Sequence, residues 1–142
     1  MEIAQVKRRV LETIDAAKKT AADRRARTDA AGREYEQFLE HVAVPVFRQV
    51  ANVLRAESYA FTVFTPAGGV RLSADRAGED YIELTLGASD GEPRVMGHLS
   101  RARGRRVIES EDVIADRLPG AITEDDVLGF VLRELGPYVE RG

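Results

Sequence analysis

The 142-residue sequence has no cysteine, no tryptophan and only two histidines. Without cysteine the chain has no disulfide framework, no thiolate metal ligand and no cysteine nucleophile. Two histidines argue against a metal centre built from several imidazoles. No stretch approaches the roughly 18 consecutive apolar residues that a membrane-spanning helix needs. We therefore expect no cofactor, no metal and no membrane partner.

The common sequence signatures of catalysis are also missing. There is no Gly-rich loop ending in Gly-Lys-Ser/Thr, no H-E-x-x-H, no G-x-S-x-G and no acidic calcium loop. Gly68-Gly69 lies between two expected strands rather than between a strand and a helix, so we interpret it as a turn and not as a phosphate cradle. The early acidic residue Glu2 and the lack of an apolar segment behind it argue against a secretory signal. We expect a cytosolic, non-catalytic protein.

What is present fits one folded domain. Hydrophobic residues make up 44% of the chain and charged residues 32%, which is typical of a globular protein. The net charge of −3 is unevenly distributed. Residues 7–27 carry eight basic and three acidic side chains, whereas residues 111–142 carry three basic and eight acidic ones. A basic segment beside an acidic end permits pairing between copies as well as contact with nucleic acid.

The N-terminal region is typical of a helix. Residues 2–43 contain no proline and one glycine, and a stripe of apolar side chains recurs every three or four residues at Ile3, Val6, Val10 and Ile14. Residues 15–34 have no large apolar side chain and only alanine to bury. Tyr35 then begins a second apolar stripe.

Two shapes are compatible with this pattern. One helix over residues 2–43 would be about 63 Å long, which exceeds the roughly 30 Å diameter of a small domain. Alternatively the chain turns near residues 28–32 and forms a helical hairpin. We favour the single helix because no strong turn dipeptide lies there. Residues 1–34 are then a helical extension that acts as an oligomerisation arm, and residues 35–142 form one domain.

The remaining pattern predicts an α+β domain. Pro45 should kink the helix and start a second one, with an apolar face formed by Val46, Phe47, Val50, Val53 and Leu54. From Ser58 the apolar period falls to two, and short connectors favour an antiparallel five-stranded meander with strands at Tyr59–Phe64, Val70–Ala74, Tyr81–Leu86, Arg94–Arg101 and Arg106–Ser110. Both helices should cover one face of this sheet.

A C-terminal helix should complete the fold. Thr123 and Asp126 resemble a capping box at its start, and Gly136-Pro137 should stop or kink it. Its expected apolar face is Val127, Leu128, Val131, Leu132 and Leu135.

Asp90-Gly91 sets the strand register, because Asp-Gly is preferred in two-residue type I′ hairpins. With this turn, the core side pairs Leu86 with Val95, Leu84 with Gly97 and Ile82 with Leu99. The other side pairs Thr85 with Met96, Glu83 with His98 and Tyr81 with Ser100.

This register makes Glu83, His98 and Tyr81 a candidate polar site. A carboxylate beside an imidazole can orient it for proton transfer. If Arg103-Gly104 is also a two-residue turn, His98 faces Glu109 as well. We favour a charged ladder on a solvated sheet face, because no nucleophile or metal site converges there.

A cluster of four arginines forms a second candidate site, at Arg101, Arg103, Arg105 and Arg106. A basic β-ribbon can lie against phosphates. However, no aromatic residues are interleaved for stacking on single strands, and the isoelectric point is near 5.5. Nucleic acid is therefore a possible partner but not the favoured one.

The leading hypothesis is a self-associating protein-interaction module. Ile3, Val6, Val10 and Ile14 would bury against a second copy of the chain, with a dimer favoured. The alternatives are nucleic-acid binding through Arg101–Arg106 and the basic helix, and a small-ligand binder or enzyme that uses the His98 side of the sheet.

Overall fold

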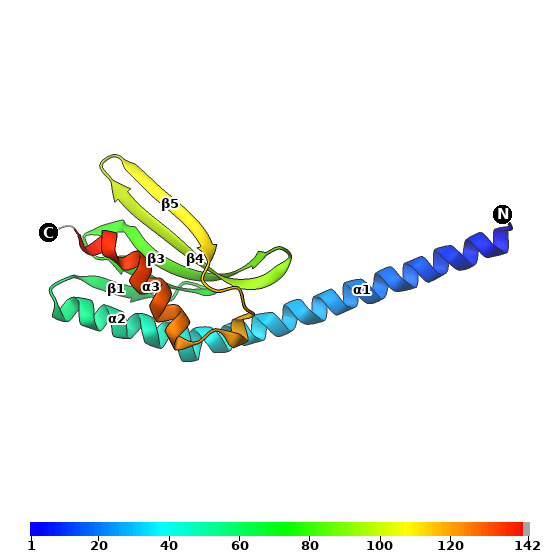
Figure 1. The fold of residues 1–142 in the computed structure, drawn as a ribbon, viewed down its shortest axis with the longest axis horizontal. Coiled ribbons are helices and arrows are strands. Elements are labelled where there is room, and N and C mark those ends of the chain that lie inside the picture. Colours follow the sequence, from blue (N-terminus) through cyan, green and yellow to red (C-terminus); the bar gives the residue numbers. More distant parts are fainter. Residues whose placement is uncertain (141–142) are drawn as a thin grey trace.

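A computed structural model describes residues 1–140 of the chain (Figure 1). Arg141 and Gly142, the end of the predicted domain, lie outside the described residues. The α+β architecture predicted from the sequence is confirmed. The elements, in chain order, are α1 (Ile3–Phe38), the π-helical turn η1 (Leu39–Ala43), α2 (Val44–Ala56), β1 (Phe61–Phe64), β2 (Gly69–Ala74), β3 (Ala77–Ser89), β4 (Glu92–Arg103), β5 (Arg106–Val113), the 3₁₀ turn η2 (Pro119–Ala121) and α3 (Glu124–Val139).

Helix α1 is one uninterrupted helix, so the helical-hairpin alternative is wrong. Its 36 residues span about 54 Å at 1.5 Å per residue. Figure 1 shows it leaving the domain as an isolated rod, with the N-terminus at the far end. Ala31, Tyr35 and Phe38, near its C-terminal end, are its buried residues. No helix within residues 1–140 combines the length and hydropathy needed to cross a bilayer.

The kink expected at Pro45 is confirmed, and the turn η1 explains how the chain stays helical through it. The backbone N–H of Val44 donates to the carbonyl of Leu39, five residues earlier. Pro45 then occupies the first turn of α2, where its missing N–H is tolerated. A proline ring normally clashes with the carbonyl four residues back, and the wider turn before it provides the room.

The five strands form one antiparallel sheet in the order β1-β2-β3-β4-β5. The register predicted from Asp90-Gly91 is confirmed, with Leu84 opposite Gly97 and Glu83 opposite His98. Asp90 and Gly91 have φ values of 52° and 77°, which are the positive values of a type I′ turn.

The second hairpin differs from the prediction. Arg103 pairs with Arg106, so the turn is Gly104-Arg105 rather than Arg103-Gly104. Gly104 has φ 61° and takes the first central position, as glycine does in a type II′ turn. His98 consequently faces Glu111, and not Glu109 as we expected.

The core lies between the helices and one sheet face, as predicted. Its most completely buried large side chains include Phe47, Leu72, Ile82, Leu84, Val95, Val127 and Val131. Phe130, which the helical pattern did not indicate, also belongs to this core and contacts β4.

The predicted apolar faces of α2 and α3 are wider than the surface that each helix buries against the sheet. Val53 is 64% exposed and Leu132 58% exposed, so both fall outside the core to which we assigned them. Leu128 is also exposed, because a 3.6-residue repeat places adjacent apolar residues on both sides of the contact line.

Helix α3 begins as predicted and ends later. The Thr123 side chain accepts a hydrogen bond from the N–H of Asp126, and the Asp126 side chain accepts one from the N–H of Thr123, which completes the capping box. The helix then continues through Pro137 to Val139, so of the two expected effects of Gly136-Pro137, a stop or a kink, the stop is wrong. The Tyr138 hydroxyl anchors this last turn to the sheet, at 3.0 Å from the carbonyl oxygens of both Tyr81 and Ser100.

Candidate functional site

The N-terminal arm (residues 1–34) presents its apolar stripe to solvent. Ile3 is 88% exposed, Val6 42%, Val10 51% and Ile14 41%. Leu11 lies beside them and is also exposed. Among residues 1–140, no other element lies beside the arm at this end (Figure 1), so these side chains form an apolar surface that the described chain does not cover.

The charges of the arm are equally unpartnered. Within residues 1–140, no ion pair joins any basic side chain of residues 7–27 to a carboxylate. The hydroxyls of Thr13 and Thr20 donate to carbonyl oxygens one turn earlier and reach no other element. The arm therefore exposes both an apolar stripe and a basic excess that its own chain leaves free.

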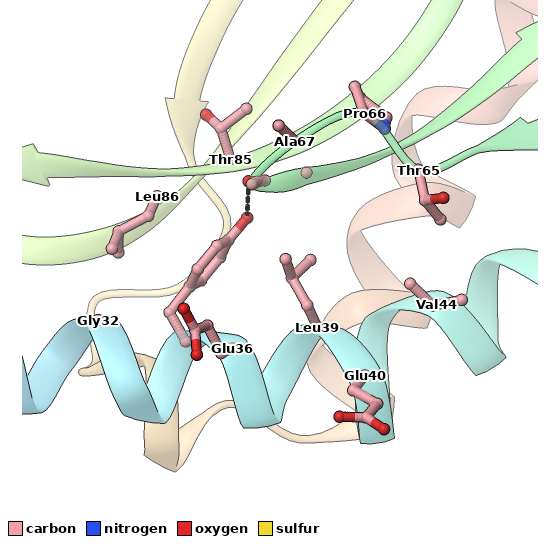
Figure 2. Close-up of a pocket in the computed structure, with 13 residues that line it drawn as sticks. Gly32, Glu36, Leu39, Glu40, Val44, Thr65, Pro66, Ala67, Thr85 and Leu86 are labelled. Carbon is pink, nitrogen blue, oxygen red and sulfur yellow. Dashed lines mark hydrogen bonds between the residues drawn. The ribbon is translucent and has the colours of Figure 1, made fainter.

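A cleft of about 790 Å³ lies where α1 meets the sheet (Figure 2). We call it the base cleft. Its helical wall comes from the end of α1, from η1 and from the first residue of α2, and its other wall comes from the β1–β2 loop, the start of β2 and β3. The residues that line it are Gly32, Tyr35, Glu36, Leu39, Glu40, Val44, Thr65, Pro66, Ala67, Gly68, Gly69, Thr85 and Leu86.

Tyr35 holds the two walls of the base cleft together. Its hydroxyl donates to the carbonyl oxygen of Gly68 at 2.8 Å, a bond visible in Figure 2. Burial raises the pKa of Tyr35 far above its usual value, and the negative charge of Glu83 raises it further. The phenol therefore stays neutral and remains a hydrogen-bond donor to the Gly68 carbonyl.

Glu36 and Glu40 supply the negative charge of the base cleft. Both are exposed, and in the described chain neither forms an ion pair. Figure 2 shows both carboxylates on the helical wall, whereas Leu39 and Leu86 point between the walls. The base cleft is therefore apolar inside and acidic along one edge.

A second apolar surface, the α2–α3 groove, encloses about 290 Å³. It contains the exposed side chains of Val53, Leu128 and Leu132 and is bordered by Glu124 and Asp125. All of its lining residues come from α2 and α3, so it does not adjoin the arm.

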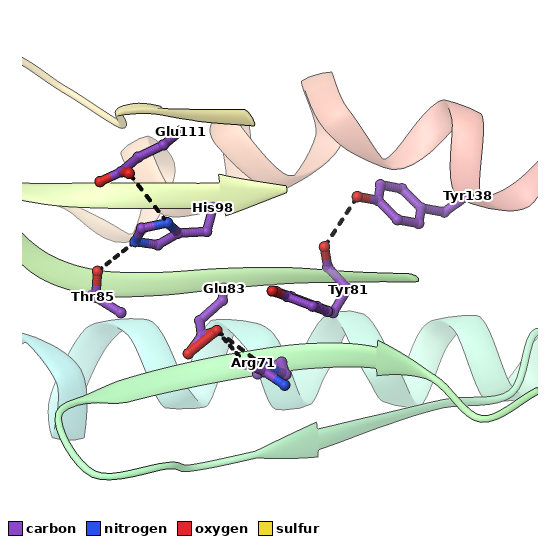
Figure 3. A network of polar contacts seen from close by, with 7 residues as sticks. All are labelled: Arg71, Tyr81, Glu83, Thr85, His98, Glu111 and Tyr138. Atoms are coloured by element: carbon purple, nitrogen blue, oxygen red, sulfur yellow. Dashed lines mark hydrogen bonds and ion pairs between the residues drawn. The ribbon is translucent and has the colours of Figure 1, made fainter. Parts of the chain in front are cut away.

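The structure brings the predicted polar site together on the sheet face that the helices do not cover (Figure 3). Arg71, Glu83, His98 and Glu111 form one row across four strands. The Arg71 guanidinium lies 2.7 Å from Glu83 Oε2 and 4.0 Å above the centre of the Tyr81 ring.

His98 is held between two neighbours. Its Nε2 lies 2.7 Å from Thr85 Oγ1, and its Nδ1 lies 3.7 Å from Glu111 Oε2, an ion pair when the imidazole is protonated. A depression of about 330 Å³ adjoins His98 and Tyr81 but not Glu83.

The chemistry around His98 is that of a cross-strand ladder. Arg71 neutralises Glu83, so this carboxylate is not a free base for the imidazole. Ser100, the nearest hydroxyl in the same strand on this face, is buried. Among residues 1–140 no group of His, Asp and Glu is arranged to hold a metal ion.

The four arginines lie along the β4–β5 hairpin toward its tip. Arg103, Arg105 and Arg106 are exposed, and Arg101 is half-buried. No ion pair joins any of them to a carboxylate within the described chain. The acidic stretch after β5 uses other partners, since Asp116 pairs with Arg94 and Asp126 with Arg117.

Comparisons with protein-family models, with curated proteins and with solved structures gave no match to this chain. Its function is therefore inferred from its residues and their geometry.

The sequence pattern did not indicate the base cleft, including its residues Glu36, Glu40 and Leu86. The two glutamates lie four residues apart on a helix whose other half is basic, and that contrast could have indicated them. We expected Leu86 in the core, and its pairing with Val95 is as predicted, but it lines the open base cleft and is 37% exposed.

Proposed function

We propose that the protein is a non-catalytic module that self-associates through its N-terminal arm. The observation that supports this most directly is the exposed stripe of Ile3, Val6, Val10 and Ile14 on a helix with no local core. Exposed apolar patches of this kind mark interaction sites or aggregation liabilities. A second copy of the same chain is present wherever the first one is, so this partner requires no other protein.

The energetics favour pairing of two arms. Fully burying each of these side chains contributes about 1.5–3 kcal/mol, and in a two-fold symmetric dimer the same stripe is buried twice. An isolated helix in water also gains little from propensity alone, because most helical stability in proteins comes from packing of an apolar face. Association therefore stabilises both the stripe and the helix that carries it.

The alanine-rich middle of the arm suits a close antiparallel contact. On the stripe side of residues 15–34, Ala17 and Ala21 are small, so two helices can approach closely at these positions, while the long side chain of Arg24 extends along the edge of the contact. An antiparallel pair also separates the two domains, which leaves both arginine hairpins outside the contact.

Molar mass by light scattering tests the proposal. The parent chain should be a dimer at tens of micromolar, and Val6→Asp with Val10→Asp should make it monomeric, because two charges per arm would have to be desolvated in the contact. Far-UV and near-UV circular dichroism should show the same folded sheet in both proteins.

The matched control places the same two charges elsewhere on the arm. Ala16→Asp with Ala26→Asp adds two carboxylates on the side of the helix turned away from the stripe and should leave the dimer intact. A monomeric parent chain, or a dimer that survives Val6→Asp with Val10→Asp, would refute self-association through the arm.

A second candidate function is binding of an anionic polymer such as nucleic acid. It is favoured by one observation, the absence of carboxylate partners for Arg101, Arg103, Arg105 and Arg106 within the described chain. Guanidinium groups on a β-hairpin can contact phosphates. This function is compatible with self-association, since the hairpin lies away from the arm (Figure 1).

A further inference from the structure

We infer that the base cleft of one copy receives the apolar tip of the arm from a second copy. This inference rests on the proposed self-association and specifies the surface on which each arm ends. It has two independent supports: the direction of the stripe and the position of the charges.

The stripe leads directly into the base cleft. An α-helix turns about 100° per residue, which places Val10, Ile14 and Ala21 on the same side of α1 as Gly32 and Leu39. These last two residues line the cleft. A helix that lies along the stripe of α1 therefore continues, without a change of direction, between α1 and the sheet.

An antiparallel pair of arms brings the apolar tip of one arm to the cleft of the other copy. With a two-fold axis between Ala22 and Asp23, the partner's Val10 lies near Tyr35, and the partner's Val6 lies near Leu39. In the middle of the pair, Ala17 lies opposite the partner's Thr28, and Ala21 lies opposite the partner's Arg24. The larger apolar side chains of the tip thus meet the open cleft, where they have room to pack.

The charges agree with the same alignment. The partner's Lys7 falls beside Glu36 and Glu40 on the flank of the contact. None of these three side chains has an ion-pair partner in its own chain, within residues 1–140. Residues 7 and 36 of one chain are separated by about 44 Å of helix, so any attraction between them acts between copies.

The α2–α3 groove is the competing receptor and fits less well. It begins beyond η1 and takes no residue from α1, so a helix that follows the stripe does not enter it. Its exposed Leu132 provides a matched control for Leu86, because both are leucines that border an apolar surface.

Charge reversal provides the first test, with the dimer dissociation constant of the full chain measured by sedimentation equilibrium. Lys7→Glu alone, and Glu36→Lys with Glu40→Lys, should each weaken dimerisation by roughly tenfold, because two symmetry-related sets of pairs are lost. The triple variant K7E/E36K/E40K should restore the parental constant. Failure of the triple variant to recover would overturn the inference.

The second test compares two leucines. Leu86→Glu should weaken the dimer at least tenfold, whereas Leu132→Glu should leave the dissociation constant unchanged, with thermal melting used to confirm that both variants fold. The reverse result would move the contact to the α2–α3 groove and overturn the inference. If neither change has an effect while V6D/V10D still dissociates the dimer, the base cleft is not the surface that receives the arm. Self-association through the arm would then still hold.

The absence of cysteine allows a third test that does not depend on stability. Single-cysteine chains carrying Val10→Cys and Leu86→Cys are mixed and treated with a short thiol cross-linker, and the products are identified by mass spectrometry. We expect a product in which a Val10→Cys chain is cross-linked to a Leu86→Cys chain. A mixture that yields only products joining two Val10→Cys chains would overturn the inference and indicate contact between arm tips.

Discussion

The ring of Phe130 in α3 lies against Gly97 in β4 and fills the space that a β-carbon at position 97 would occupy. The only way for a helix to approach a strand this closely is for the strand to present no side chain. Gly97 is paired with Leu84, which is fully buried. The contact therefore sets the distance between α3 and the centre of the sheet.

Gly97→Ala should destabilise the domain by about 1–3 kcal/mol, because the added methyl group overpacks a filled core. Chemical unfolding in urea, followed by circular dichroism, measures the change. Gly78→Ala is the matched control, since a β-carbon at position 78 meets no atom within 4 Å. Equal stability of the two variants would show that Phe130 moves aside at little cost.

Thr123→Ala should lower the free energy of unfolding by about 0.5–2 kcal/mol, the usual effect of losing an N-cap side chain. The Thr123 hydroxyl accepts the N–H of Asp126 at 3.2 Å. Thr123→Ser retains the acceptor and should remain close to the parent chain. A parental melting temperature for Thr123→Ala would mean that water replaces the hydroxyl without penalty.

Asp126 should make stability depend on pH in the acid range. Its pKa is lowered from the usual value of 3.8, chiefly because its carboxylate accepts the backbone N–H of Thr123, with Arg117 adding to the effect. A lowered pKa means that this contribution is present above pH 4 or so and is lost as the pH falls through the folded-state pKa. Asp126→Asn should therefore show a shallower fall in unfolding free energy below about pH 4 than the parent chain.

Tyr138 should make stability depend on pH in the alkaline range. Burial raises the pKa of Tyr138 from 10.0 to about 12. A raised pKa means that the contribution is complete below about pH 10 and is lost as the pH rises toward 12. Tyr138→Phe should cost about 0.5–1.5 kcal/mol at neutral pH and give a shallower alkaline decline, with Tyr59→Phe as the exposed control.

Changing Arg103, Arg105 and Arg106 to Ala should leave the melting temperature nearly unchanged, because exposed charges contribute little to stability. Electrophoretic shift assays at low salt test the second candidate function on the parent chain and on this variant. Binding by the parent chain that disappears in the triple variant and weakens with salt would support an anionic polymer as partner. Binding that persists in the variant would place the contact elsewhere.

The sheet was the most predictable part of the fold, because independent signals agreed. Asp90-Gly91 requires positive φ at two positions, and the alternation of apolar residues on both strands matches the register that this turn imposes. For the β4–β5 hairpin, the predicted strand register was wrong by two residues. The reason is that Gly104 suits either central position of a two-residue turn. That error kept His98 on the correct face but changed its carboxylate partner from Glu109 to Glu111.

The base cleft was less predictable because it depends on where elements end. Periodicity indicates which side of a strand or helix is apolar, but not how far the covering layer extends. Leu86 and Val53 both follow the core pattern and both lie beyond its edge. Phe130, in contrast, is a core residue that the pattern did not indicate. Its ring fits only because Gly97 has no side chain, and the sequence pattern of α3 alone does not show which residue it faces.

The π-helical turn at Leu39–Ala43 determines the direction in which the arm presents its stripe. A π turn holds about one residue more than a turn of α-helix. Compared with an uninterrupted α-helix, this extra residue rotates the side chains of α1 by about 100° around the helix axis relative to those of α2. Loss or gain of a single residue in this turn would swing the whole stripe to another side of the molecule while the domain and the arm each kept their own sequence. In the proposed dimer, one insertion or deletion would thus change the surface that the arm of a second copy meets, although the residues at the arm's tip stay the same.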